Sequence, residues 1–172
     1  MSKKPIRVYP GSFDPITVGH IDIIKRASTQ FPDSKIHIVI ANNRDKKHMF
    51  SINERIQQVS DSIKEKGIEN IKVVAFEGII SNYLNDVNAI TIIRGIRNYT
   101  DFEYEKSLET FTRKTSNVET IYLSANPEHS SISSSNVRNF VTTGFDEAIK
   151  GFVSPSVYDR IINKKHLLRE AK

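Results

Sequence analysis

The amino-acid sequence predicts an α/β protein: a single doubly wound, Rossmann-like domain with a five-stranded parallel sheet and a C-terminal helical extension. Two observations favour this fold. Five short runs rich in β-branched residues are spread along the chain, and segments with helical periodicity lie between them. Strands that alternate with helices form parallel sheets whose two faces are both covered. No change of composition marks a linker, so we expect residues 1–172 to form one domain.

The five runs have the length and composition of buried strands. We expect these strands at Ile6–Tyr9, Ile36–Ile40, Ile71–Phe76, Ala89–Ile93 and Thr120–Leu123. His37 lies inside the second strand, where a packing or hydrogen-bonding role is expected for it.

The helices are indicated by apolar spacing and by capping residues. Ile21, Ile24 and Ala27 recur three residues apart and mark one face of a first helix. Ser51–Glu54 has the pattern of a capping box and should open a second helix. Thr100–Glu103 has the same pattern and should open a third helix, with an apolar stripe of Phe102, Leu108 and Phe111. Ser154 followed by Pro155 marks the start of the last helix.

Composition excludes several classes of protein. The chain of 172 residues has no cysteine, which excludes disulfide scaffolds, cysteine-ligated zinc, iron–sulfur clusters and thiol catalysis. Its formal net charge of +5 suits an anionic partner, although a lysine-rich solvated surface explains the charge equally well. The apolar runs are far shorter than the ~20 residues that span a bilayer, and the N-terminus has no run of signal-peptide length. We therefore expect a cytoplasmic protein with no membrane partner and no nucleic-acid partner.

The end of the first strand carries groups that suit an anion. Doubly wound sheets bind ligands at the carboxyl ends of their strands, where the strand order reverses. Gly11 permits close backbone approach, and Ser12 offers a hydroxyl and an amide. Thr17 and His20 follow at a helix start, where His20 would face the same anion. The alternative is a turn with a helix cap at Thr17 and a solvated His20.

The ends of the fourth and fifth strands add further phosphate-binding groups. Arg94 and Arg97 follow the fourth strand, and their planar forks suit phosphate; as surface residues they would instead pair with Asp101 or Glu103. The segment Ile132–Arg138 places serine hydroxyls and amides at a helix start, which suits a triphosphate or simple capping. The chain has neither a P-loop nor a G-x-G-x-x-G pattern.

Together these segments resemble a known family. Thr17–His20 and Ile132–Arg138 are similar to the paired T/H-x-G-H and I-S-S-x-x-x-R motifs of a nucleotidyltransferase superfamily. Within that superfamily the chain resembles the bacterial phosphopantetheine adenylyltransferases, at Tyr9–Thr17, Lys46–Phe50, Arg94–Arg97 and Asp101–Glu105. The resemblance implies that ATP and 4′-phosphopantetheine give 3′-dephospho-coenzyme A and pyrophosphate, and it implies a homo-oligomer, a hexamer in this family.

The resemblance also implies roles for individual residues. His20 would stabilise the transition state. The acceptor 4′-phosphopantetheine would be bound by Ser12, Lys46, Ile80 and Arg94. ATP would be bound by Ser12, Phe13, His20, Gly95, Ile96, Arg97, Glu105, His129, Ser130, Ser131, Ile132, Ser133, Ser134 and Ser135. The chain departs from the family at three positions: Ser12 stands where threonine is frequent, His48 where proline is common, and Thr112 where asparagine is often found.

The expected chemistry needs no metal site on the protein. The five histidines lack metal-site spacing, so we expect Mg²⁺ to be carried on the ATP phosphates. Two other classes of function remain open. Another transferase of the superfamily, using nicotinamide mononucleotide or a cytidylyl donor, would keep His20 and the serine motif but should lack the unit from Arg94 to Glu105. A non-catalytic nucleotide sensor or RNA-binding domain would explain the charge alone.

Overall fold

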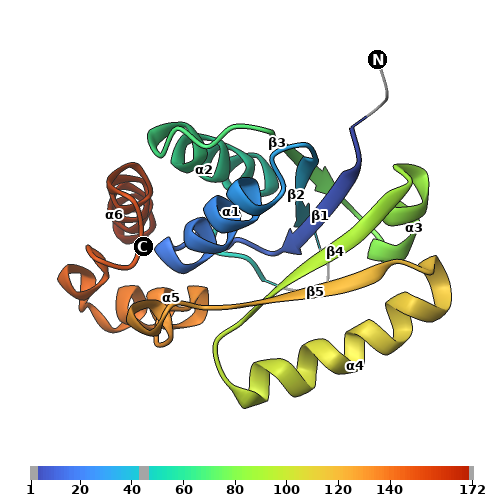
Figure 1. The fold of residues 1–172 in the computed structure, drawn as a ribbon. Helices are drawn as coiled ribbons and strands as arrows, with labels where there is room; N and C mark the ends of the chain where they lie inside the picture. The colour runs from blue at the N-terminus through green and yellow to red at the C-terminus, as the bar shows by residue number, and fades with distance from the viewer. Residues whose placement is uncertain (1–3, 43–46, 171–172) are drawn as a thin grey trace.

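The protein is a five-stranded parallel sheet in the order β3-β2-β1-β4-β5, with helices on both faces (Figure 1). The structure is a computed structural model that describes residues 4–42 and 47–170, with side chains up to residue 165. The elements are β1 Ile6–Gly11, α1 Val18–Gln30, β2 Lys35–Ala41, α2 Ile52–Glu65, β3 Ile71–Phe76, α3 Ile80–Asp86, β4 Ala89–Ile96, α4 Tyr99–Ser116, β5 Glu119–Ser124, the 3₁₀ turns η1 Pro127–His129 and η2 Asp146–Ile149, α5 Ser134–Thr143 and α6 Pro155–Glu170. This architecture confirms the predicted fold class.

Two apolar clusters lie on opposite faces of the sheet. The larger one joins β2 residues such as Ile38 to Ile24 of α1, Val59 of α2, Val137 of α5 and Val157 of α6. The smaller cluster packs Val8, Val39 and Ile92 against Tyr83 and Leu84 of α3. Burial of these aliphatic side chains supplies most of the favourable free energy of folding, at ~25 cal/mol per Å² of apolar surface.

The strands extend further than the sequence predicts. β1 continues to Gly11, and β4 continues to Ile96, so that Arg94 pairs with Tyr122 inside the sheet. Arg94 was expected just past the strand. The hydrogen bonds of the sheet therefore fix the backbone of Arg94. His37 is buried in β2, and its Nδ1 lies 2.8 Å from the hydroxyl of Tyr83, in agreement with the hydrogen-bonding role expected for it.

Helix α4 differs from the prediction in both its start and its packing. Asn98, and not Thr100, caps the helix by accepting a hydrogen bond from the Asp101 N–H. Phe102 and Phe111 of the expected apolar stripe are 37% and 51% exposed. The face toward the sheet is polar instead, and Glu109 accepts a hydrogen bond from the Tyr122 hydroxyl at 2.9 Å. The short helix α3 has no side-chain cap and was not predicted.

No helix in the described part of the chain is both long enough and apolar enough to cross a membrane.

Candidate active site

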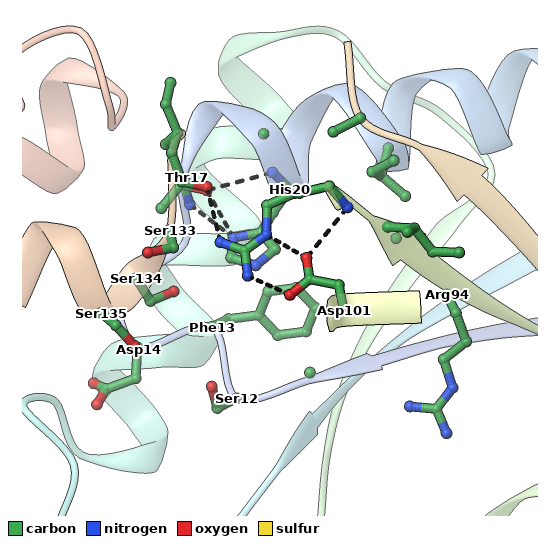
Figure 2. Close-up of a pocket in the computed structure, with 18 of the residues that line it drawn as sticks. Ser12, Phe13, Asp14, Thr17, His20, Arg94, Asp101, Ser133, Ser134 and Ser135 are labelled. Carbon is green, nitrogen blue, oxygen red and sulfur yellow. Dashed lines mark hydrogen bonds and ion pairs between the residues drawn. The ribbon is translucent and has the colours of Figure 1, made fainter. Parts of the chain in front are cut away.

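A cavity of about 460 Å³ opens where β1, β4 and β5 end, beside the first turns of α1 and α5. The strand order reverses between β1 and β4, which is the position expected for a ligand site in a doubly wound sheet. Figure 2 shows Ser133, Ser134 and Ser135 on one side of this pocket and Arg94 on the other, with Phe13 and His20 between them in that view.

The loop after β1 forms the floor of the pocket. A side chain at Gly11 would place its Cβ 2.9 Å from the ring of Phe13, so the close approach of that ring requires glycine. Phe13 has a left-handed backbone with φ +46° and is 1% exposed. Its ring lies edge-on to the imidazole of His20, with the ring centroids 5.2 Å apart. The ring of Phe13 in this loop therefore packs against His20, and Ser12 of the same loop lines the pocket.

Thr17 and His20 form a reciprocal cap at the start of α1. The Thr17 hydroxyl accepts a hydrogen bond from the His20 N–H, and the Thr17 N–H donates to His20 Nδ1 at 3.1 Å. Because Nδ1 is an acceptor, the neutral imidazole carries its proton on Nε2. Burial, with a smaller effect from Arg97, lowers the pKa of His20 to about 4. Both sequence interpretations are thus partly right: Thr17 is a cap, yet His20 is not solvated and lines the pocket.

The arginines of β4 each have an acidic partner on α4. Arg97 is paired with Asp101, with Nε 2.7 Å from the carboxylate, as the surface alternative predicted. Arg94 is buried and lies 3.1 Å from Glu105. Burial raises the pKa of Glu105 above its usual range, although Arg94 opposes this shift. The Nε of Arg94 and the Oε2 of Glu105 are both buried with no hydrogen-bond partner among the described residues.

The start of α5 closes the other side of the pocket. Ser133 caps the helix by accepting from the Asn136 N–H. Ser134 donates to the carbonyl of Pro15 at 2.8 Å, and Arg138 donates to the carbonyl of Asp14 at 2.6 Å. These bonds tie α5 to the loop after β1. The first N–H groups of a helix have no intrahelical acceptor and carry partial positive charge, so this edge suits phosphate oxygens.

Most of the residues predicted for the site line this one pocket. They are Ser12, Phe13, His20, Arg94, Gly95, Ile96, Arg97, Glu105, His129, Ile132, Ser133, Ser134 and Ser135. Ser130 and Ser131 lie in the adjoining turn and do not line it: the Ser130 hydroxyl donates to Pro127 and the Ser131 carbonyl accepts from Asn136. Ile80 packs against the smaller core cluster, away from the pocket lining. Lys46 lies outside the described residues.

The pocket also contains groups that the sequence analysis did not assign to it. They include Tyr9, Asp14, Ile23, Lys47, His48, Asp101 and Tyr104; Arg138, the last residue of the predicted phosphate-binding segment, also lines the pocket. Asp14 is 2% exposed, and its carboxylate accepts from the N–H groups of Met49 and Phe50 at 2.8 and 2.9 Å. Asp14 lies in the loop after β1, and its partners Met49 and Phe50 are distant in the sequence. Sequence periodicity therefore gave no signal for this contact. Thr112, noted as a departure from the family, is buried on α4 and donates to the Leu108 carbonyl.

Comparison with known proteins identifies the family. The cytidylyltransferase-like family model matches residues 8–140. A phosphopantetheine adenylyltransferase from Clostridium novyi is 39% identical over 160 residues, which cover 92% of this chain and 96% of the relative. The chain belongs to the phosphopantetheine adenylyltransferases.

Solved structures of more distant adenylyltransferases share the fold of this family member. A nicotinic acid mononucleotide adenylyltransferase from Plasmodium falciparum superposes with a TM-score of 0.61 at 21% identity, over 94% of this chain and 96% of that chain. A bifunctional NMN adenylyltransferase/ADP ribose pyrophosphatase from Francisella tularensis gives a TM-score of 0.66 at 16% identity, over 94% of this chain and 49% of that chain.

The protonation state of His20 in this adenylyltransferase can be measured directly. Because burial lowers its pKa to about 4, the ring should stay neutral from pH 8 down to about 5 and gain a proton only below that range. Imidazole ¹⁵N and ¹³C NMR, assigned with a His20→Asn variant, should report the Nε2–H tautomer through that range. Titration near pH 6.5, or a proton on Nδ1, would contradict the geometry described above.

Proposed function

We propose that this protein transfers the adenylyl group of ATP to 4′-phosphopantetheine, which gives 3′-dephospho-coenzyme A and pyrophosphate in coenzyme A synthesis. The observation that carries the proposal is the 39% identity to a phosphopantetheine adenylyltransferase over almost the whole chain. The arrangement of the pocket supports it, because Ser133–Ser135 at the start of α5 lie on one side and Arg94 lies on the other, with His20 between them in the view of Figure 2.

Different residues of the pocket are proposed to bind the two substrates. The start of α5 at Ser133–Ser135, together with Gly95–Arg97, Glu105 and His129, would bind ATP. Ser12 lies in the floor and would contact phosphates of both substrates. Arg94, with its unpartnered Nε, would bind the phosphate of phosphopantetheine, and Lys46 is proposed to assist it. The assignments of Ser130 and Ser131 to ATP, and of Ile80 to the pantetheine arm, stay predictions from the family resemblance.

The reaction is a direct displacement at phosphorus. An oxygen of the phosphopantetheine phosphate attacks the α-phosphorus of ATP while the bond to the bridging oxygen of pyrophosphate breaks, and that oxygen keeps the electron pair. The nucleophile is already an anion, so no protein base and no covalent intermediate is required. His20 would donate its Nε2–H to an α-phosphate oxygen as charge develops there. The remaining task is alignment of two polyanions, which can contribute up to ~7–11 kcal/mol.

Magnesium is proposed to enter as part of the substrate, on the ATP phosphates. The carboxylates of the described pocket residues are already engaged, Asp14 with two backbone N–H groups, Asp101 with Arg97 and Glu105 with Arg94. No group of three potential metal ligands is found among the described residues. These engaged carboxylates fit an Mg²⁺ ion that keeps its waters and needs few protein ligands. The homohexamer stays a prediction of the family resemblance, and the cytoplasmic location stays a prediction from the short apolar runs of the sequence.

A pyrophosphate-release assay tests the proposed function. The purified protein should release pyrophosphate from MgATP when 4′-phosphopantetheine is added, and should release little with no acceptor. Nicotinamide mononucleotide and nicotinic acid mononucleotide serve as matched acceptors, since both also present a phosphate monoester. Equal or faster turnover with either nucleotide would overturn the acceptor assignment and favour another transferase of the superfamily.

The role of Arg94 is tested by substitution. If its guanidinium binds the acceptor phosphate, Arg94→Ala should weaken phosphopantetheine binding about 10- to 100-fold, the loss expected for a charge-assisted hydrogen-bonded pair. ATP binding should change much less. Arg94→Lys should recover only part of the affinity, because it supplies a point charge in place of a fork. Calorimetry on the folded variants measures both affinities, and unchanged acceptor affinity in Arg94→Ala would refute this role.

A further inference from the structure

Arg55 is a buried cation beneath the active-site floor. It lies on α2, is 1% exposed and does not line the pocket. Its Nη1 donates to the carbonyls of Ser12 and Ala41 at 2.9 and 3.1 Å, and its Nη2 donates to the side-chain oxygen of Asn42 at 2.9 Å. One side chain of α2 therefore joins the end of β2 to the loop after β1.

Packing alone does not account for this arginine. Its hydrogen bonds in the described part of the chain all go to uncharged oxygens, and its Nε has no partner there. Burial lowers the pKa of Arg55, with Asp14 opposing this shift, yet a guanidinium stays protonated in proteins. Desolvating such a charge is costly, and an apolar side chain of similar volume often fills a buried site at least as well.

The bond to Ser12 determines which way the next amide points. The Ser12–Phe13 peptide is trans, and in a trans peptide the carbonyl oxygen and the amide hydrogen point in opposite directions. The Ser12 carbonyl points into the protein toward Arg55, so the Phe13 N–H points to the pocket side. No described residue accepts a hydrogen bond from that N–H. Phe13 also has the left-handed φ of +46°, a conformation that a phenylalanine keeps only when its surroundings hold it.

We propose that Arg55 is a positioning residue of this enzyme: it holds the Ser12–Phe13 peptide so that the Phe13 N–H faces the pocket as a donor for a phosphate oxygen. Through the same peptide it holds the ring of Phe13 against His20. The kinetic part of this proposal rests on the proposed function, but the orientation of the Phe13 amide does not.

The test compares Arg55→Met with Arg7→Met. Arg7 lies at the opposite end of β1, where it donates to Ser34 and Thr91 and stacks on Phe31, far from the carboxyl ends of the strands. Burial lowers the pKa of both arginines, and both donate hydrogen bonds to uncharged oxygens, although Arg7 is only partly buried. We expect Arg55→Met to lower kcat/KM about 10- to 100-fold, as for other lost positioning contacts, and Arg7→Met to stay within about threefold of the wild type even if it is less stable.

A spectroscopic readout separates positioning from loss of stability. The chain has nine phenylalanines, so protein labelled with [¹⁵N]phenylalanine gives a simple amide spectrum in which a Phe13→Tyr variant assigns Phe13. Titration with inorganic pyrophosphate should shift the Phe13 amide in the wild type and in Arg7→Met, and should shift it far less in Arg55→Met. This experiment needs no turnover, so a wild type that is inactive with phosphopantetheine would refute the proposed function without deciding the role of Arg55.

Arg55→Lys provides the second variant if Arg55→Met does not fold. Lysine keeps the charge, but its ammonium group falls short of the positions of the two Nη atoms, so we expect kcat/KM to fall about 3- to 10-fold with a weakened Phe13 shift. Wild-type kcat/KM and a full Phe13 shift in any folded Arg55 variant would overturn the proposal. An equal loss of activity in Arg7→Met would overturn it too, because the effect would then belong to stability.

Discussion

The reversal of strand order between β1 and β4 is the constraint on which the rest of the structure depends. The chain builds outward from β1 to β3, crosses the sheet, and starts again with β4 beside β1. Residues of α1, α2, α5 and α6 pack into the apolar cluster on one face of the sheet, and residues of α3 pack into the cluster on the other face. The loops that follow β1 and β4 therefore part from each other, and the space between them is the active-site pocket. Many of the lining residues lie at strand ends and helix starts, where the sheet fixes their backbone positions.

Two arginines of the pocket are already paired with carboxylates before any substrate binds. Arg94 faces Glu105 and Arg97 faces Asp101, while burial, with a smaller effect from Arg97, lowers the pKa of His20 and keeps its ring neutral. The phosphates of a polyanionic substrate would compete with these carboxylates for the arginines, and one of them could accept a hydrogen bond from the unpartnered Nε of Arg94. A neutral His20 with its proton on Nε2 can donate without first losing or gaining a proton. This arrangement suits a reaction whose main requirement is to bring two anions together.

The sequence was most informative about elements with strong local signals. The five strands, the capping box at Ser51 and the helix start at Ser133 all appear where the pattern predicts them. Local signals failed where tertiary contacts decide the outcome. Phe102 and Phe111 of the expected apolar stripe on α4 are exposed, and the buried residues of this helix are the polar Glu109 and Thr112.

The same limit applies to the site. Thirteen of the predicted residues meet in one pocket, because motifs at the strand ends of a doubly wound sheet must converge. Asp14 and Arg55 were not foreseen, since their importance comes from backbone groups that are distant in sequence, such as the Phe50 N–H and the Ser12 carbonyl. A choice between a cap and a pocket position for Thr17 and His20 also could not be made from spacing, because the two residues form a capping box and also line the pocket.

The central claim is that the pocket aligns two phosphates for a single direct displacement, and the stereochemical course at phosphorus tests it most directly. ATP with one sulfur of known configuration on the α-phosphorus should react with 4′-phosphopantetheine to give a dephospho-coenzyme A phosphorothioate of inverted configuration. One in-line attack inverts the phosphorus centre, whereas transfer through a covalent adenylyl-enzyme inverts it twice. Inversion is the result that this account predicts, and net retention of configuration would contradict it.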